Sequence, residues 1–151
     1  DSLEGIEDTS RTLQAILGGI GGITLFVAAL GITNTMIMSI YERTREIGIM
    51  KVIGASLADI RSIFLMEAAL IGLFGGILGL GLSYGASEII NRISADYIQR
   101  GMGGPATDIS VIPVWLAGFA LVFSIFIGLA AGLYPASRAI RVSPMVAIRN
   151  E

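Results

Sequence analysis

Residues 12–41 read TLQAILGGIGGITLFVAALGITNTMIMSIY and contain no charged side chain. Two further runs, residues 68–87 and 109–137, are also free of charges. A membrane-spanning helix needs about 20 predominantly apolar residues, and a charge at the bilayer centre costs roughly 2.5–3.5 kcal/mol. A soluble chain of 151 residues could not wrap three such helices in protein. The sequence therefore predicts an all-α membrane bundle with three transmembrane helices.

The composition excludes most enzyme chemistry. The mean hydropathy is +0.78, and 15% of the residues are charged, against roughly a quarter in an ordinary soluble domain. The chain has no cysteine and no histidine, so it lacks thiolate nucleophiles and the commonest general base and metal ligand. The only lysine, Lys51, follows Met50, so the Gly-Lys-Ser/Thr loop that holds nucleotide phosphates is absent. We predict no catalytic site, no metal site and no cofactor in this chain.

Basic residues are distributed unevenly between the two sides of the predicted bundle. The first connecting loop and the C-terminal tail carry seven Lys or Arg residues, whereas the N-terminal segment and the second loop carry three. Cytoplasmic loops are enriched in such residues, so we expect the first loop and the tail to face the cytoplasm. The predicted segments are an extracytoplasmic stalk (1–12), a transmembrane helix (13–40), a cytoplasmic helix with the start of the next helix (41–67), a transmembrane helix (68–87), an extracytoplasmic loop that turns at the interface (88–108), a transmembrane helix (109–137) and a cytoplasmic tail (138–151).

The first span is longer than the bilayer requires. At about 1.5 Å per residue, residues 13–40 would reach roughly 42 Å, against a hydrocarbon core of about 30 Å. Upstream, apolar or small residues follow steps of three and four, as in a coiled-coil seam: Leu3, Ile6, Ser10, Leu13 and Leu17. We expect the helix to continue outward as a packed stalk. The alternative is an amphipathic helix lying on the membrane, which its acidic polar face disfavours.

Glycines recur at four-residue spacing in the predicted spans. The pairs are Gly18 and Gly22, Gly72 and Gly76, Gly75 and Gly79, Gly81 and Gly85, and Gly128 and Gly132. Such pairs let helix backbones approach each other closely in lipid. They predict tight packing among the spans or against a second copy of the chain.

The connection between the first two spans mixes charged and apolar residues. It begins with charges of alternating sign and then becomes apolar at Ile47, Met50 and Ile53, which we expect on one helical face. An ordinary interfacial loop is one interpretation. The other is a site of protein recognition, which the matching numbers of acidic and basic residues beside apolar ones favour.

Local signals divide this connection into two helices. Gly54 suits the C-cap of a short amphipathic helix. Ser56 with Asp59 three residues later is typical of a capping box that starts the next helix. The sequence therefore predicts a short helix, a sharp turn and a second helix that runs into the second span.

Three polar or helix-disturbing positions have more than one interpretation. Glu67 either pairs with Arg61 or Arg138 or is exposed without a partner. Asn34, inside the first span, is expected to hydrogen-bond a neighbouring helix. Pro135 is expected to disturb the inner end of the third span, because proline removes one helix hydrogen bond.

Several motifs, in order along nearly the whole chain, resemble the MacB/FtsX-like permease family of ABC transporters, and the MacB type most closely. They are Glu42-Arg43-Thr44-Arg45-Glu46-Ile47-Gly48-Ile49, Gly54-Ala55-Ser56, Asp59-Ile60, Phe64-Leu65-Met66-Glu67-Ala68, Tyr134-Pro135-Ala136-Ser137-Arg138-Ala139 and Ser143-Pro144-Met145-Val146-Ala147-Ile148-Arg149. Family members have four spans, with a large extracytoplasmic domain between the first and the second. The resemblance implies that this chain is the C-terminal part, with spans two to four, in a bacterial or archaeal cell (inner) membrane.

The resemblance also implies the partners and the residues that meet them. The cytoplasmic helix would be a coupling helix that docks on an ABC ATPase subunit, which binds ATP and Mg²⁺. A second permease copy would complete a homodimer, an extracytoplasmic adaptor protein is a candidate partner, and no nucleic acid is expected. The residues assigned to ATPase coupling are Glu42, Arg43, Arg45, Glu46, Ile47, Gly48, Met50, Lys51 and Gly54. Those assigned to helix packing are Gly18, Gly22, Gly72, Gly76, Gly79, Gly128 and Gly132.

The implied function is mechanical transmission. ATP-driven motion of the ATPase would pass through the spans to the extracytoplasmic domain and export or extract a hydrophobic or peptide-like substrate. The charge-free runs contain no ionisable group of the kind that usually marks an intramembrane ion or substrate path, which agrees with this interpretation. The alternative is a transmembrane regulator of cell-wall hydrolases, which shares the fold and the ATPase but moves no substrate.

Overall fold

A computed structural model describes residues 2–101 and 109–141 of the chain. Its helices are α1 (Ser2–Glu42), α2 (Thr44–Ile53), α3 (Leu57–Gly101) and α4 (Val114–Ala139), and the described residues contain no strand. Three of the helices, α1, α3 and α4, are long and apolar enough to cross a membrane. The predicted all-α membrane bundle is therefore confirmed.

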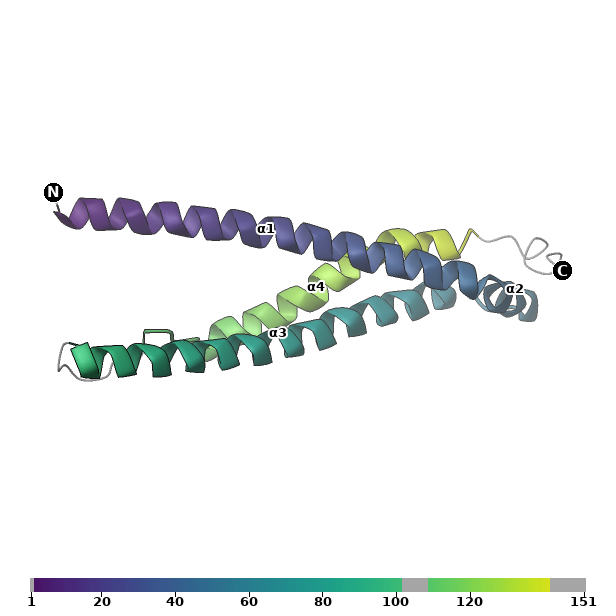
Figure 1. Ribbon diagram of the computed structural model, residues 1–151. Coiled ribbons are helices and arrows are strands. Elements are labelled where there is room, and N and C mark those ends of the chain that lie inside the picture. The colour runs from purple at the N-terminus through teal and green to yellow at the C-terminus, as the bar shows by residue number, and fades with distance from the viewer. Residues whose placement is uncertain (1, 102–108, 142–151) are drawn as a thin grey trace.

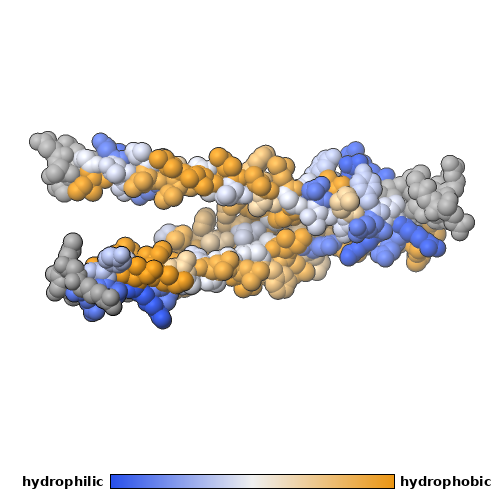
Figure 2. Space-filling model, in the orientation of Figure 1, coloured by the Kyte–Doolittle hydropathy of each residue, from blue (hydrophilic) through white to orange (hydrophobic). Residues whose placement is uncertain are grey.

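All three long helices come together at one end, and toward the other end α1 diverges from α3 and α4 (Figure 1). α4 packs against α3 along most of its length and meets α1 only near the end that carries α2 (Figure 1). We call this end of the molecule the α2 end. Figure 2 shows an apolar belt across the long helices and a hydrophilic region at the α2 end, the surface pattern of a membrane-spanning bundle.

Both α1 and α3 are longer than a bilayer is thick. With 41 and 45 residues, they reach roughly 62 and 68 Å at about 1.5 Å per residue, against a hydrocarbon core of about 30 Å. α1 is one continuous helix through the segment predicted as a stalk. From residue 5 to residue 28 every residue is exposed, so this half of α1 lies outside the core of the described chain.

The expected loop at residues 88–108 begins later than the sequence indicated, because α3 continues to Gly101. Helical pairing supports this extension: the Arg92 guanidinium donates to the Glu88 carboxylate at 2.9 Å, four residues away. Residues 102–108 lie outside the described part of the chain, as do residues 142–151 of the expected tail.

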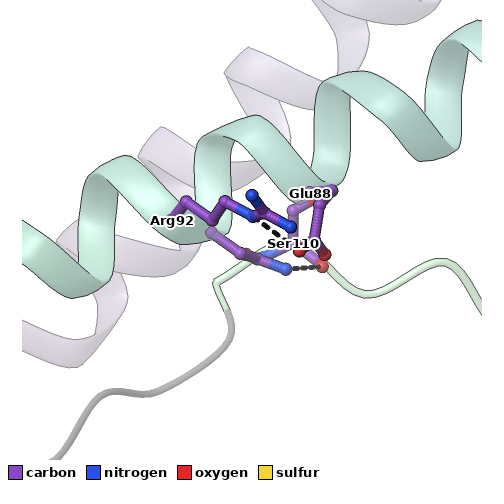
Figure 3. Close-up of polar contacts among 4 residues, drawn as sticks. Glu88, Arg92 and Ser110 are labelled. Atoms are coloured by element: carbon purple, nitrogen blue, oxygen red, sulfur yellow. Dashed lines mark hydrogen bonds and ion pairs between the residues drawn. The ribbon is translucent and has the colours of Figure 1, made fainter.

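The extended segment before α4 is held against α3 by the Asn91 side chain. The Asn91 amide nitrogen donates to the Ser110 carbonyl at 2.8 Å, and its carbonyl oxygen accepts from the backbone N–H groups of Ile109 and Ser110. Figure 3 shows Ser110 on this segment beside Glu88 and Arg92 of α3. Pro113 is extended (φ −69°, ψ 144°) and precedes the first residue of α4, which is why the helix starts at Val114 rather than at residue 109.

Pro135 does not end α4, which continues to Ala139. Proline lacks the N–H that would bond the carbonyl four residues earlier, and that carbonyl belongs to Ala131. The Thr33 hydroxyl of α1 donates to the Ala131 carbonyl at 2.9 Å. The neighbouring helix therefore satisfies the acceptor that the proline leaves open, which ties α1 to α4.

Candidate coupling site at the α2 end

Backbone geometry separates α2 from its neighbours. Arg43 interrupts the helical geometry between α1 and α2 with φ −97° and ψ 14°. At the other end, Gly54 adopts φ +102°, a left-handed conformation that a side chain would disfavour. The N–H groups of Gly54 and Ala55 donate to the Lys51 and Met50 carbonyls. The predicted glycine C-cap is thereby confirmed.

The start of α3 has the predicted capping box. The Ser56 backbone N–H donates to Asp59 Oδ2 at 3.3 Å, and the Asp59 backbone N–H donates to Ser56 Oγ at 3.1 Å. These reciprocal bonds satisfy two of the donors that a helix N-terminus leaves open. Because the cap of α2 and the cap of α3 are two residues apart, α2 folds back sharply against the spans.

A buried apolar cluster joins α2 to all three long helices. Ile47 of α2 is completely buried, and it lies in a cluster with residues of α1, α3 and α4. The cluster consists of Met36, Ile40, Ile47, Ile60, Phe64, Ala68, Ala136 and Ala139. Interiors packed in this way transmit displacement because they have little free volume. The cluster therefore ties α2 to one end of each of the three spans.

Polar contacts add to this cluster at its edge. The Lys51 ammonium donates to the Ile140 carbonyl at 2.8 Å, which links α2 to the end of α4. The Arg138 guanidinium donates to the Tyr41 hydroxyl at 2.7 Å and lies 5.5 Å from the Tyr41 ring centre. This pair connects α4 to α1, and sequence reasoning did not find it because the two residues are 97 positions apart.

Glu67 pairs with Arg43, with Arg43 Nη1 and Glu67 Oε2 3.8 Å apart. The sequence had suggested Arg61 or Arg138 as its partner, and both suggestions were wrong. Arg138 is instead engaged with Tyr41, and the break between α1 and α2 places Arg43 beside α3. Both side chains are partly exposed, so the pair contributes at most about 1 kcal/mol.

The apolar residues of α2 do not share one face as expected. Ile47 is buried and Met50 is partly buried against the cluster, but Ile53 is 80% exposed. Ile49 and Val52 are exposed as well, because the helix turns these positions away from the spans. We call Ile49, Val52 and Ile53 the outer face of α2.

The residues assigned to ATPase coupling therefore fall into two groups. Ile47 and Gly48 are buried, and Met50 and Lys51 are half-buried, so these residues hold α2 on the bundle. The exposed members are Glu42, Arg43, Arg45, Glu46 and Gly54. They lie at the two ends of α2, around its outer face, where another protein can reach them.

Two of the glycine pairs meet where α3 crosses α4. A side chain at Gly72 would approach the Ser124 carbonyl to 2.5 Å, and one at Gly128 would approach the Ala68 carbonyl to 2.5 Å. At Gly76 and Gly132 the obstructing atoms are the Ser124 hydroxyl and the Ala68 methyl group. The helices are thus in backbone contact, and Ser124 Oγ donates across it to the Gly72 carbonyl at 2.9 Å.

Ser124 was missed from the sequence, although its position four residues before Gly128 continues the small-residue stripe of α4. Gly18, Gly22 and Gly79 stand in contrast, since nothing lies within 4 Å of a side chain placed at any of them. Their role in packing remains a prediction about a surface that this chain alone leaves open. Asn34 is also exposed, so the expected hydrogen bond to a neighbouring helix is not seen among the described residues.

Comparisons with known proteins agree with this arrangement. Residues 18–144 match the family described as FtsX-like permease C-terminal. The ABC transporter permease YtrF of Bacillus subtilis is 39% identical over 99% of this chain and 35% of its own length. An uncharacterized ABC transporter permease of Methanocaldococcus jannaschii is 36% identical over 96% of this chain and 37% of its own length.

The macrolide export ATP-binding/permease protein MacB of Bdellovibrio bacteriovorus is 38% identical over the whole of this chain and 21% of its own length. The chain thus spans about a third of the two permeases and about a fifth of MacB. The match to the family covers the buried cluster, α2 and the α3–α4 crossing. The chain therefore belongs to the FtsX-like family of ABC transporter permeases, as the C-terminal region of such a permease.

Proposed function

We propose that this chain couples a cytoplasmic ABC ATPase to an extracytoplasmic domain by rigid motion of its helices, and so drives export or extraction of a hydrophobic or peptide-like substrate. The observation that carries the proposal is the construction of α2. Its inner side is buried against all three long helices, while its outer face leaves Ile49, Val52 and Ile53 exposed. A helix so placed can receive force on one side and pass it on from the other.

In this proposal the α2 end faces the cytoplasm. The excess of Lys and Arg in the first connection and in the tail supports that orientation. The ATPase binds ATP and Mg²⁺, and this chain contributes only the docking surface. Among the described residues no group of three or more acidic side chains could hold a metal ion, and no step of the proposal needs one here.

Protein interfaces combine an apolar centre with a polar rim, and the outer face of α2 has that composition. Its apolar residues are flanked by the exposed charges Glu42, Arg45 and Glu46. Several relatives are named ATP-binding/permease proteins, so in those proteins an ATP-binding part and a permease part share one chain. This supports an ATPase as the protein that covers α2.

The far ends of α1 and α3 carry the motion outward. Both helices extend well beyond the thickness of a bilayer, and both are joined to α2 through the buried cluster. A second copy of the permease, packed on the exposed half of α1, would complete the assembly. The apolar side chains and the Gly18–Gly22 pair on that half support this part of the proposal.

Site-directed crosslinking tests the docking. This chain has no cysteine, so Val52→Cys in the full-length permease places the only thiol of this region on the outer face of α2. Membranes containing the permease and its ATPase should give a permease–ATPase crosslink whose yield changes with ATP. Tyr97→Cys, equally exposed but near the opposite end of α3, is the matched control and should give none.

A Val52→Cys thiol that an impermeant reagent labels only from outside the cell would overturn the orientation. A thiol that is labelled from the cytoplasm but never crosslinks would reject the ATPase as the occupant of α2.

A further inference from the structure

A pocket of about 420 Å³ opens between the ends of α1 and α4 at the α2 end. It is lined by Tyr41 from α1, by Tyr134, Ser137 and Arg138 from α4, and by Arg141 just beyond α4. It is separate from the outer face of α2, none of whose residues lines it. The coupling function assigned above makes no use of it.

The pocket is positively charged. Among the described residues that line it, two are arginines and none is acidic. Within residues 2–101 and 109–141 neither arginine pairs with a carboxylate. One N–H of Arg138 is used by the Tyr41 hydroxyl, which holds the guanidinium in place and leaves its other donors available. A fixed guanidinium beside a second one is suited to a phosphate group, which can accept bonds from both.

The hydroxyl groups of the pocket supply further hydrogen-bond donors for an anion. The Tyr41 oxygen accepts a hydrogen bond from Arg138, so its own hydrogen is free for an anion. Tyr134 is 61% exposed and presents a second phenol. Ser137 donates to the Leu133 carbonyl at 2.7 Å and is therefore not a donor to the pocket. The available donors are two guanidinium groups and two phenols.

The pocket lies where two of the charge-free runs end, at the boundary between apolar and charged parts of the sequence. Tyr41 is the last residue of one charge-free run, and Arg138 is the first charged residue after another. Tyrosines collect at this depth in membrane proteins, level with the lipid headgroups. Exposed Met38 on α1 and Leu133 on α4 lie within one turn of the lining residues and offer apolar surface on the bilayer side.

We propose that this pocket binds the phosphate of an anionic phospholipid, whose acyl chain lies along the apolar surface next to Met38 and Leu133. Basic pockets between transmembrane helices are typical sites for anionic headgroups. The apolar flank favours a lipid over soluble phosphate, and the position on the bilayer side favours it over an acidic side chain of the ATPase. A lipid held there would bridge α1 and α4 beside the buried cluster. The proposal goes beyond the coupling function and holds for either orientation of the chain.

The test uses the full-length permease without its ATPase, in nanodiscs of phosphatidylcholine with a minor fraction of phosphatidylglycerol. Native mass spectrometry after release from the nanodisc measures which lipid stays bound. The wild type should retain phosphatidylglycerol in preference. Arg141→Gln and Arg138→Gln should each lower that preference about fivefold, from about 1 kcal/mol per arginine at a lipid surface. Arg138→Lys, which keeps the charge, should lose less.

Arg61→Gln is the control. It removes one exposed positive charge from the same end of the molecule, at a position outside the pocket, and should leave the preference unchanged. Arg141→Gln should not disturb folding, because the exposed Arg141 side chain makes no hydrogen bond or ion pair with the described residues.

Four outcomes would overturn the proposal: equal retention of both lipids by the wild type, an equal loss with Arg61→Gln, displacement of the lipid by inorganic phosphate, or an Arg141→Gln variant that keeps the lipid in the nanodisc but no longer binds the ATPase in a separate pull-down with the ATPase added. The third would assign the pocket to free phosphate, and the fourth to the ATPase.

Discussion

The two halves of α1 have opposite surroundings. Near the α2 end, Met36 and Ile40 are buried against α3 and α4, and Thr33 bonds a carbonyl of α4. In the other half, Leu17 and Ile23 are 67% and 68% exposed although they are as apolar as the buried residues. In a lipid bilayer such exposure carries no hydrophobic penalty. Burial within the chain therefore identifies where the helices pack on one another, and hydrophobicity alone does not.

This contrast separates two mechanical roles. At the α2 end, contacts from four helices make one unit that resists relative motion. In the open half, every residue of α1 from 5 to 28 is exposed. In the proposed coupling function, a displacement at α2 would reach the long helices through this unit and would turn them most at their far ends.

The largest effect on stability is expected from Ile47→Ala, which leaves a cavity between α2 and the long helices. Replacing a fully buried isoleucine with alanine costs about 2–5 kcal/mol, so the free energy of unfolding in detergent should fall by that amount. Ile53→Ala removes the same atoms from the outer face and should change the unfolding free energy by less than about 0.5 kcal/mol. ATPase binding should be weakened by Ile53→Ala. Equal destabilisation by the two variants would contradict the division of α2 into an inner and an outer face.

Gly128→Leu should come next, because its side chain has to displace the backbone of α3 at Ala68. Overpacking of this kind costs about 1–3 kcal/mol, which should lower the thermal stability of the purified permease. Gly118→Leu on the same helix is the control, since nothing lies within 4 Å of that position. An unchanged melting temperature for Gly128→Leu would show that α3 and α4 are not in backbone contact.

Thr33→Val should have a smaller effect that depends on Pro135. The variant removes the donor to the Ala131 carbonyl and should cost about 0.6–1.7 kcal/mol. In a Pro135→Ala background the restored backbone N–H can bond that carbonyl, so Thr33→Val should cost less there. The double-mutant cycle in unfolding free energy measures the difference. Thr35→Val, whose hydroxyl bonds a carbonyl of its own helix, should show no coupling to position 135.

The smallest effect on the stability of one chain is expected in the open half of α1. Leu17→Cys should leave the unfolding free energy unchanged, because this side chain is 67% exposed. If a second copy packs on this half, the thiols of two permeases should form a disulfide in oxidised membranes. Leu82→Cys, an exposed position on α3, provides the comparison. A disulfide at position 82 without one at position 17 would place the second copy on α3 instead.

Much of the candidate site could be predicted because its signals are local. The caps at Gly54 and at Ser56 with Asp59 are made by hydrogen bonds between residues only a few positions apart. These caps can therefore be predicted from the local sequence. The outer face of α2 could not be read in this way. Ile47 and Ile53 have the same hydrophobicity, and only the direction in which α2 folds back decides which of them is buried.

The sequence by itself determined three apolar spans, a short helix between the first two, and the family to which the chain belongs, since each depends on composition or on residues close together in the chain. The tertiary structure alone decided which glycines meet, that Glu67 pairs with Arg43, and that Thr33 bonds a carbonyl one helix turn from Pro135. It also decided that Tyr41 and Arg138 form one side of a pocket. The physical reason is the crossing of the helices. Residues far apart in the chain become partners only where two helices come into contact, and the local sequence does not specify where that crossing lies.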